Sequence, residues 1–214
     1  MHISVKQRII SLAFCLFIFI SCSSKPTPSY EDNAKIDLSG DPEMQMIENL
    51  DTLKSTKNGI DWTVKLKATY RIRAIVLSRR NYGGGWNAIL SPCDLALAWG
   101  NLTKDNLYKK IKWSQNNRWY FWRYGDDFSY DNGFINRYSS NNHIIPATPN
   151  LTKTVKSLRR DDIVELTGYL VDIDAKEGND TYWWNSSTSL TDAGDGSCEV
   201  LYLVKLKVGN KIYQ

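Results

Sequence analysis

The stretch Trp62-Thr-Val-Lys-Leu-Lys-Ala-Thr-Tyr-Arg-Ile-Arg-Ala-Ile-Val-Leu77 decides the fold. Apolar side chains alternate with basic and hydroxyl side chains along most of it. A period of two is that of a β-strand with one face in the core and the other in solvent. The sequence therefore predicts a long strand over 62–77 in a mostly antiparallel sheet.

Basic side chains stand on the predicted outer face of this strand, at Lys65, Lys67, Arg71 and Arg73. Such a row could bind a polyanion or a surface of anionic lipid. It is equally typical of a solvated strand whose lysines discourage pairing with another chain. Both interpretations are open from the sequence.

Further elements follow on the C-terminal side. Ser91 suits a helix N-cap, Pro92 the first helical position and Gly100 the C-terminal cap, so a helix is predicted over 91–100. Further predicted helices cover 103–112 and 149–158, and further predicted strands cover 118–124, 163–173, 181–187 and 199–208.

The phrase Asp161-Asp-Ile-Val-Glu-Leu-Thr-Gly-Tyr-Leu-Val171 resembles a strand of a small barrel of the OB type, in which the chain bends at a glycine. The predicted fold class is therefore α+β. It comprises a mostly antiparallel, curved sheet or small OB- or SH3-like barrel with two or three short helices. The predicted globular domain covers 59–214.

The N-terminus is typical of an export signal. Lys6 and Arg8 precede an apolar run over 9–20, which is shorter than the ~20 residues of a membrane-spanning helix. Phe19-Ile-Ser-Cys22 then resembles the cleavage site of a bacterial lipoprotein. The sequence predicts a signal peptide over 1–21 and lipidation of Cys22, with an ordinary secretory signal or an uncleaved anchor as alternatives.

Residues 22–58 are polar and contain prolines near their start, which predicts a flexible lipidated tether. The expected location is the bacterial cell membrane or outer membrane, facing the periplasm. Loss of Lys6 and Arg8 leaves 25 basic and 23 acidic side chains. This small excess does not favour nucleic acid as a partner.

Signal cleavage and lipidation would also decide which cysteines are available to form a disulfide. Cys15 lies in the signal peptide and Cys22 carries lipid, which leaves Cys93 and Cys198. In an oxidising compartment these two could form a disulfide. Alternatively, both are buried thiols that pack like small apolar side chains.

Several motifs together resemble a family of uncharacterised exported bacterial proteins. They are Ser91-Pro-Cys-Asp-Leu-Ala-Leu-Ala-Trp-Gly100, Ser140-Asn-Asn-His-Ile-Ile-Pro-Ala147, Gly168-Tyr-Leu-Val171, and Trp184-Asn-Ser-Ser187 followed by Gly194-Asp-Gly-Ser-Cys-Glu199. The resemblance covers about 60–205 and implies no established activity. This chain departs from similar sequences at Leu190, where they tend to carry Arg, and at Cys93.

His143 is the histidine that remains after signal removal, and histidine suits acid–base catalysis near neutral pH. A hydrolase would combine it with a nucleophile and an orienting acid; the candidates are Ser140, Ser187 or Cys198 as nucleophile and Asp94 or Asp192 as acid. No spacing indicates that these residues meet, and a histidine that orders its loop is the alternative. Neither a metal site nor a cofactor is expected.

The chain is rich in aromatic side chains, with eight Trp and twelve Tyr. These side chains fill cores, but some could form a binding surface together with basic residues. Trp119 and Arg123 share one face of the strand predicted over 118–124. The leading functional hypothesis is a non-catalytic, lipid-anchored module that binds an envelope protein or polymer, and the alternative is a small envelope hydrolase using His143.

Overall fold

The computed structural model describes residues 25–31, 35–48, 52–192, 194 and 196–214. The predicted signal peptide over 1–21 and the predicted lipidation site Cys22 lie outside the described residues. Among the residues that are described, no helix has the length and apolarity needed to cross a bilayer.

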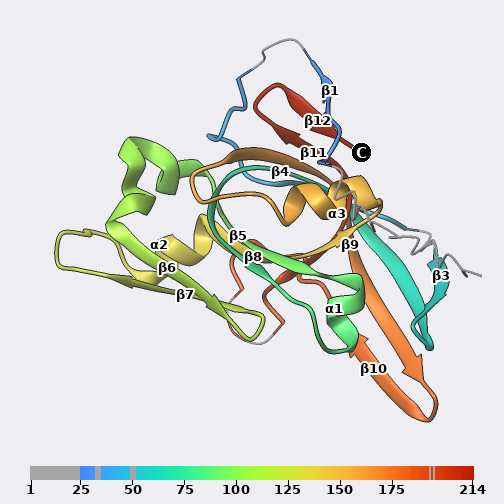
Figure 1. Ribbon diagram of the computed structural model, residues 1–214. Coiled ribbons are helices and arrows are strands. Elements are labelled where there is room, and N and C mark those ends of the chain that lie inside the picture. Colours follow the sequence, from blue (N-terminus) through green and yellow to red (C-terminus); the bar gives the residue numbers. More distant parts are fainter. Residues whose placement is uncertain (1–24, 32–34, 49–51, 193, 195) are drawn as a thin grey trace, which may run out of the picture.

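The chain forms a strongly curved sheet with a few short helices around it (Figure 1). The strands are β1 (Ser29–Tyr30), β2 (Glu43–Met46), β3 (Thr52–Lys57), β4 (Ile60–Asn81), β5 (Cys93–Ala98), β6 (Ile111–Asn116), β7 (Trp119–Tyr124), β8 (Ser139–Pro146), β9 (Ile163–Glu177), β10 (Asp180–Trp184), β11 (Glu199–Val208) and β12 (Lys211–Tyr213). The helices are α1 (Trp86–Leu90), α2 (Asn132–Arg137) and α3 (Pro149–Val155), and η1 (Gly100–Lys110) is a 3₁₀ segment interrupted by a kink. The predicted α+β class with a mostly antiparallel, curved sheet is confirmed.

The pairings of five strands return to their starting point. β4 pairs with β5, β5 with β8, β8 with β11, β11 with β9, and β9 with β4. The β8–β11 pair is parallel and the other four are antiparallel. We refer to β4, β5, β8, β9 and β11 as the five-strand ring.

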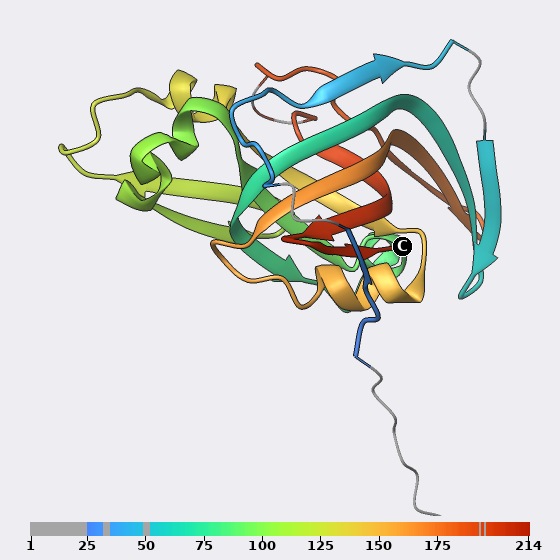
Figure 2. The same cartoon turned by 90° about the horizontal axis from the view of Figure 1, so that it is seen from above.

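β4 is the longest strand and confirms the strand predicted over 62–77. Its register shifts opposite β9 between Leu66 and Ala68, and opposite β5 between Val76 and Ser78. Such irregularities bend a strand and increase its twist. β4 can therefore pair with β9 along most of its length and with β5 near its end, as Figure 2 shows from above.

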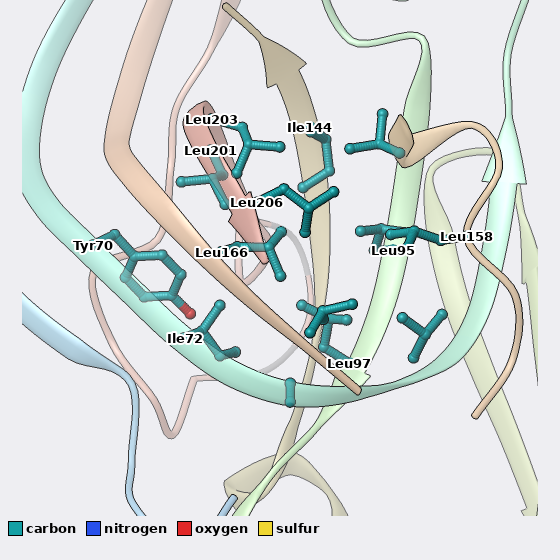
Figure 3. Packing of buried hydrophobic residues seen from close by; sticks show 14 of the residues in the cluster. Tyr70, Ile72, Leu95, Leu97, Ile144, Leu158, Leu166, Leu201, Leu203 and Leu206 are labelled. Carbon is teal, nitrogen blue, oxygen red and sulfur yellow. The ribbon is translucent and has the colours of Figure 1, made fainter. Parts of the chain in front are cut away.

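The main core lies inside the five-strand ring. The inward side chains of the ring strands meet there, among them Leu95, Leu97, Ile144, Leu166 and Leu201 (Figure 3). α3 contributes further apolar side chains to this cluster, at Leu151, Val155 and, just after its end, Leu158. Thr148 caps α3 by accepting a hydrogen bond from the backbone amide of Leu151, as its predicted start required.

Gly168 is the glycine of the predicted barrel-like strand, and it lies where β9 is paired on both sides. It faces Tyr70 of β4 and Leu203 of β11. A Cβ atom at this position would lie 2.0 Å from the carbonyl oxygen of Tyr202. The close approach of β11 therefore requires glycine here.

The predicted tether is ordered over much of its described length, which corrects the expected boundary at residue 59. β2 and β3 pair with β4, and β1 pairs with β12. The amide of Thr27 donates to the Asn150 side chain, and Asn150 donates in return to the Thr27 carbonyl. The described chain thus contacts the domain from Thr27 onward.

The helix predicted over 91–100 is wrong, because 93–98 form strand β5. Cys93, Leu95 and Leu97 point into the ring, while Ala96 and Ala98 pack in a second cluster outside it. A strand buried on both faces shows an unbroken apolar run that periodicity cannot distinguish from a buried helix. Likewise the helix predicted over 103–112 is the kinked η1, and β6 begins at Ile111.

The aromatic strand predicted over 118–124 is confirmed as β7. It forms a hairpin with β6 that projects from the ring (Figure 1). Several of its aromatic side chains, with Trp113 of β6, pack against the cluster outside the ring. This hairpin brings aromatic side chains to the outer faces of β5 and β8.

Candidate functional site

The candidate site lies on the outer faces of β5 and β8. Asp94 and His143 are directly opposite each other in this antiparallel pair. Their neighbours in the register, Cys93 and Ile144, point into the core. Because side chains alternate along a strand, Asp94 and His143 both point outward.

Asp94 and His143 are buried beneath the residues that cover this face, with exposed fractions of 0% and 3%. Nδ1 of His143 lies 3.0 Å from Oδ1 of Asp94, although the angle is not that of a hydrogen bond. The His143 ring also packs against Trp184, with ring centroids 4.4 Å apart. The structure therefore brings together the predicted base and the predicted acid.

Arg118 is the counter-charge of Asp94. Its Nη1 lies 2.7 Å from Oδ1 of Asp94, and its Nη2 donates to the carbonyl of Ser91. The guanidinium carbon lies 3.7 Å from the centre of the Tyr82 ring. Arg118 thus fastens the β6–β7 hairpin to the connection between β4 and β5.

The turn before β7 aims Arg118 at this position. Asn117 and Arg118 link β6 to β7, with φ of 47° and 70°. Two positive φ values are those of a tight hairpin turn whose twist matches that of its strands, and glycine or asparagine usually occupies it. Arginine at φ 70° carries backbone strain, which the contacts with Asp94, Ser91 and Tyr82 offset.

A cleft of about 400 Å³ opens over His143 and Arg118. We refer to it as the outer cleft; it is lined by Arg118, Trp119, His143, Trp183, Trp184, Asn185, Gly196 and Cys198. Trp183 has an exposed fraction of 74%. The volume of the outer cleft is that of a small-molecule site. Aromatic walls with few polar groups are also typical of such a site.

The predicted nucleophiles form no hydrogen bond with His143 in the described part of the chain. Ser187 donates to Asp192, with the oxygens 2.7 Å apart, and the Ser140 hydroxyl accepts from Asn142. Cys198 lines the outer cleft, but burial raises the pKa of its thiol to about 12, which disfavours the thiolate. Within the described residues, His143 has no hydrogen bond to a serine or a cysteine.

Cys93 and Cys198 are both free thiols, so the disulfide considered from the sequence is not formed. Cys93 points into the core beside the carbonyl of Val155, whereas Cys198 accepts a weak hydrogen bond from Asn141. Burial also raises the pKa of the Cys93 thiol to about 12. The alternative of two thiols that pack as small side chains fits this arrangement.

The four residues of the predicted basic row on β4 are all paired with carboxylates. Lys65 lies 2.5 Å from Asp174 and Lys67 lies 3.2 Å from Asp172, both on β9. Arg71 and Arg73 share Glu165 of β9 and Glu43 of β2. Since β2 and β9 flank β4, cross-strand ion pairs balance the predicted basic row.

Trp119 and Arg123 differ in position although both belong to β7. Trp119 lines the outer cleft. Arg123 is exposed farther along the hairpin, opposite Lys112, and lines no part of the cleft. Of the binding residues predicted from the sequence, Trp119 is therefore the one that lies at the candidate site.

Sequence reasoning did not single out the contributions of Arg118, Trp183 and Trp184. The two asparagines before Arg118 indicate a turn, but the direction of its guanidinium depends on its backbone conformation.

In the described part of the chain, no cluster of His, Cys, Asp and Glu side chains could hold a metal ion. Comparison with protein-family models, curated proteins and solved structures finds no match to this chain. The family resemblance therefore stays a prediction.

Proposed function

We propose that this protein is a lipid-anchored, non-catalytic binding module of the bacterial cell envelope. In this proposal the five-strand ring is a barrel of the OB type, and the outer cleft binds a saccharide segment of an envelope polymer. The observation that carries it is the aromatic outer cleft, with the exposed indole of Trp183 at its wall.

Strand order supports the OB-type assignment. If β4, β5, β8, β9 and β11 are counted as strands one to five, the ring order is one, two, three, five, four, with strands three and five parallel. α3 lies between strands three and four and contributes to the core. In small barrels of this type, strands two and three and the adjacent loops bind oligonucleotides or oligosaccharides.

The position of the cleft fits that pattern. Asp94 and His143 belong to the second and third ring strands. Trp183, Trp184 and Asn185 belong to the connection between the fourth and fifth. Arg118 comes from the added β6–β7 hairpin, which follows the second ring strand. A saccharide could stack its apolar face on the indoles and bond to the polar groups between them.

Charge disfavours a polyanion such as nucleic acid in this cleft. Arg118 is the cleft's basic residue, and Asp94 already neutralises it. The basic row of β4 is balanced by acids as well. Binding to a phosphate backbone depends mainly on unpaired Lys and Arg side chains.

The proposed location in the cell envelope rests on the N-terminal sequence. A signal peptide over 1–21 and lipid on Cys22 would anchor the chain to the cell membrane or the outer membrane, facing the periplasm. The first described residues lie beside α3, near the C-terminus (Figure 2). The anchor would therefore join the domain at α3.

The alternative, a hydrolase that uses His143, has weaker support. The short distance between His143 and Asp94 favours it, but Arg118 shares the same carboxylate oxygen. His143 lacks a hydrogen-bonded serine or cysteine among the described residues, so a covalent mechanism would have no activated side-chain nucleophile. Binding without catalysis therefore accounts for more of the geometry.

Sedimentation of the purified full-length chain with insoluble peptidoglycan tests the proposed function. Trp183→Ala should lower the affinity about tenfold, the effect of losing ~1.4 kcal/mol of stacking energy. Tyr30→Ala is the matched control, because Tyr30 is another exposed aromatic residue and lies on β1.

Equal sedimentation of the wild type and Trp183→Ala would contradict a role for the outer cleft. Loss of binding in the Tyr30→Ala control would point instead to nonspecific adhesion through exposed aromatic rings. Hydrolysis of the polymer by the wild type, abolished in His143→Ala, would favour the hydrolase.

A further inference from the structure

A second cavity lies where β8 and β11 begin. These two strands are parallel, and Glu199, the first residue of β11, is opposite Asn142 within β8, so both strands begin at the same end of the ring. The cavity has a volume of about 130 Å³. We call it the Glu199 cavity; it is lined by Trp99, Trp119, Tyr120, Trp122, Asn136, Ser139, Ser140, Asn141, Ser189, Leu190, Asp192, Gly194, Ser197, Cys198 and Glu199. Trp119 and Cys198 also line the outer cleft.

Glu199 is the buried acid of this cavity, with an exposed fraction of 3%. Its Oε2 accepts no hydrogen bond from any described group. The Ser140 hydroxyl and the backbone amide of Glu199 bond to the carboxyl group, but burial dominates and raises its pKa to about 8. One oxygen of a buried acid thus lacks a protein partner, which is costly unless something else supplies it.

The charged residues in the described lining of this cavity are both acids, Asp192 and Glu199. Asp192 adds a second carboxylate, and its negative charge further raises the pKa of Glu199. None of the described lining residues is basic. Aromatic side chains supply much of the remaining wall, from Trp99, Trp119, Tyr120 and Trp122.

We propose that the Glu199 cavity binds the ammonium group of a small organic amine. Oε2 of Glu199 accepts a hydrogen bond from the ammonium group and supplies its counter-charge, and Asp192 adds to the negative potential. The indole and phenol rings of the wall stabilise the cation through their electron-rich faces. The cavity adjoins the outer cleft through Trp119 and Cys198, but the inference rests on Glu199 and does not depend on saccharide binding in the cleft.

The size and chemistry of the cavity narrow the ligand. A cavity of about 150 Å³ in another protein accepts benzene, so one of 130 Å³ suits a compound of a few non-hydrogen atoms or the tip of a longer amine. An alcohol could donate a hydrogen bond to Oε2 as well. It would leave an ionised Glu199 without a counter-charge, and this difference favours the amine.

Propylamine, which is protonated at pH 8.5, and propanol form a matched pair of probes. They have the same chain length and differ in charge. Titration of the full-length chain, monitored by the indole N–H signals of Trp99, Trp119 and Trp122, should give at least tenfold tighter binding of the amine. Compounds this small bind weakly, so the titration extends to about 100 mM at constant ionic strength.

Two variants test the role of Glu199. Glu199→Gln keeps the shape of the side chain and should reduce the preference for propylamine over propanol to less than twofold. Leu190→Lys places an ammonium group in the cavity wall and should compete with added propylamine. Asp174→Asn is the control: it removes an exposed carboxylate on β9 and should leave the preference unchanged.

Equal binding of the two probes, or failure of both to perturb the three indole signals, would overturn the inference. An undiminished preference in Glu199→Gln would also overturn it. A thermal unfolding transition measured for each variant shows whether the tested protein is folded. Peptidoglycan sedimentation of the same variants tests the outer cleft separately, so failure of one proposal is distinguishable from failure of the other.

Discussion

Glu165 and Glu199 lie on neighbouring ring strands and are both almost fully buried, yet their surroundings are opposite. Their exposed fractions are 8% and 3%. Oε2 of Glu165 lies 2.9 Å from Nη2 of Arg71 and 2.8 Å from Nε of Arg73. Oε2 of Glu199 has no described partner.

The two surroundings move the pKa values of these acids in opposite directions. Burial alone would raise the pKa of Glu165, but the hydrogen bonds and charges of Arg71 and Arg73 outweigh it and lower the pKa. Nothing comparable offsets the burial of Glu199, and its pKa rises to about 8. Ion pairing, more than depth of burial, separates the two cases.

The comparison indicates where the fold satisfies its own charges and where it does not. Along β4, acids on the flanking strands pair with each basic residue of the predicted row. At the start of β11, a buried acid faces a cavity with no basic residue among its described walls. A buried group left without compensation is a candidate for function, because it lowers stability unless a ligand binds.

The largest expected effect comes from leaving a third buried acid, Asp94, without its ion-pair partner, as Glu199 is. Arg118→Gly removes the counter-charge of Asp94 while relieving the positive φ at this position. Loss of one partner of a buried ion pair costs about 3–5 kcal/mol, which exceeds the relief of strain. Urea denaturation of the variant measures this loss.

Asn117→Gly is the control for the turn, because Asn117 has a positive φ of 47° in the same turn. It should leave stability unchanged or raise it slightly. If Arg118→Gly is as stable as the wild type, the ion pair between Arg118 and Asp94 does not stabilise the fold.

The pH dependence of the free energy of unfolding should reveal the raised pKa of Glu199. Its pKa is about 8 in the folded chain and near 4.5 when unfolded, so the folded state binds more protons between these values. Stability therefore falls as the pH rises from 4.5 to 8, by up to a few kcal/mol. Denaturation at pH 5.5 and pH 8.5 should show this fall in the wild type and a smaller one in Glu199→Gln.

A wild-type stability that rises over the same range would contradict the raised pKa of Glu199. Propylamine at about 100 mM should also reduce the fall, because a ligand that binds the folded state stabilises it.

Glu165 should behave in the opposite way in acid. Its pKa is lowered below 4.5 in the folded chain, so its stabilising effect is present above that pH and is lost as the pH falls through the folded pKa. Glu165→Gln should cost about 1 kcal/mol at pH 7, because Arg71 and Arg73 keep Glu43 as a partner. Denaturation at pH 7 and pH 3.5 measures this effect; a cost that is larger at pH 3.5 would contradict it.

The smallest effect is expected at the exposed end of the ion-pair row. Lys65 and Asp174 have side-chain exposed fractions of 40% and 54%. Solvent screens such pairs, so Lys65→Ala should leave the unfolding temperature unchanged within error. A clear fall in the thermal unfolding temperature would show that the row acts as one network.

Local pattern was sufficient for the elements with a single buried face. The alternation over 62–77 predicts β4, and the runs over 163–173 and 199–208 predict β9 and β11. Pattern failed at β5, because a strand buried on both faces loses its alternation. It also failed for β2 and β3, whose polar sequences form strands by pairing with the edges of β4.

The candidate site was only partly predictable. Asp94 and His143 are chemically conspicuous in the sequence, and the register of β5 and β8 brings them together. The place of Arg118 depends on a strained turn, and the isolation of Glu199 depends on which side chains are absent around it. Both are properties of contacts between distant parts of the chain.

The sequence by itself determined the alternating strand β4 and the capped helix α3, because periodicity and helix capping act over a few residues. Its N-terminus resembles that of an exported lipoprotein, which stays a prediction. Only the tertiary structure decided which acids have partners. Ionisation depends on burial and on charges within a few ångströms, and the fold alone decides that Glu165 meets two arginines while Glu199 faces a cavity.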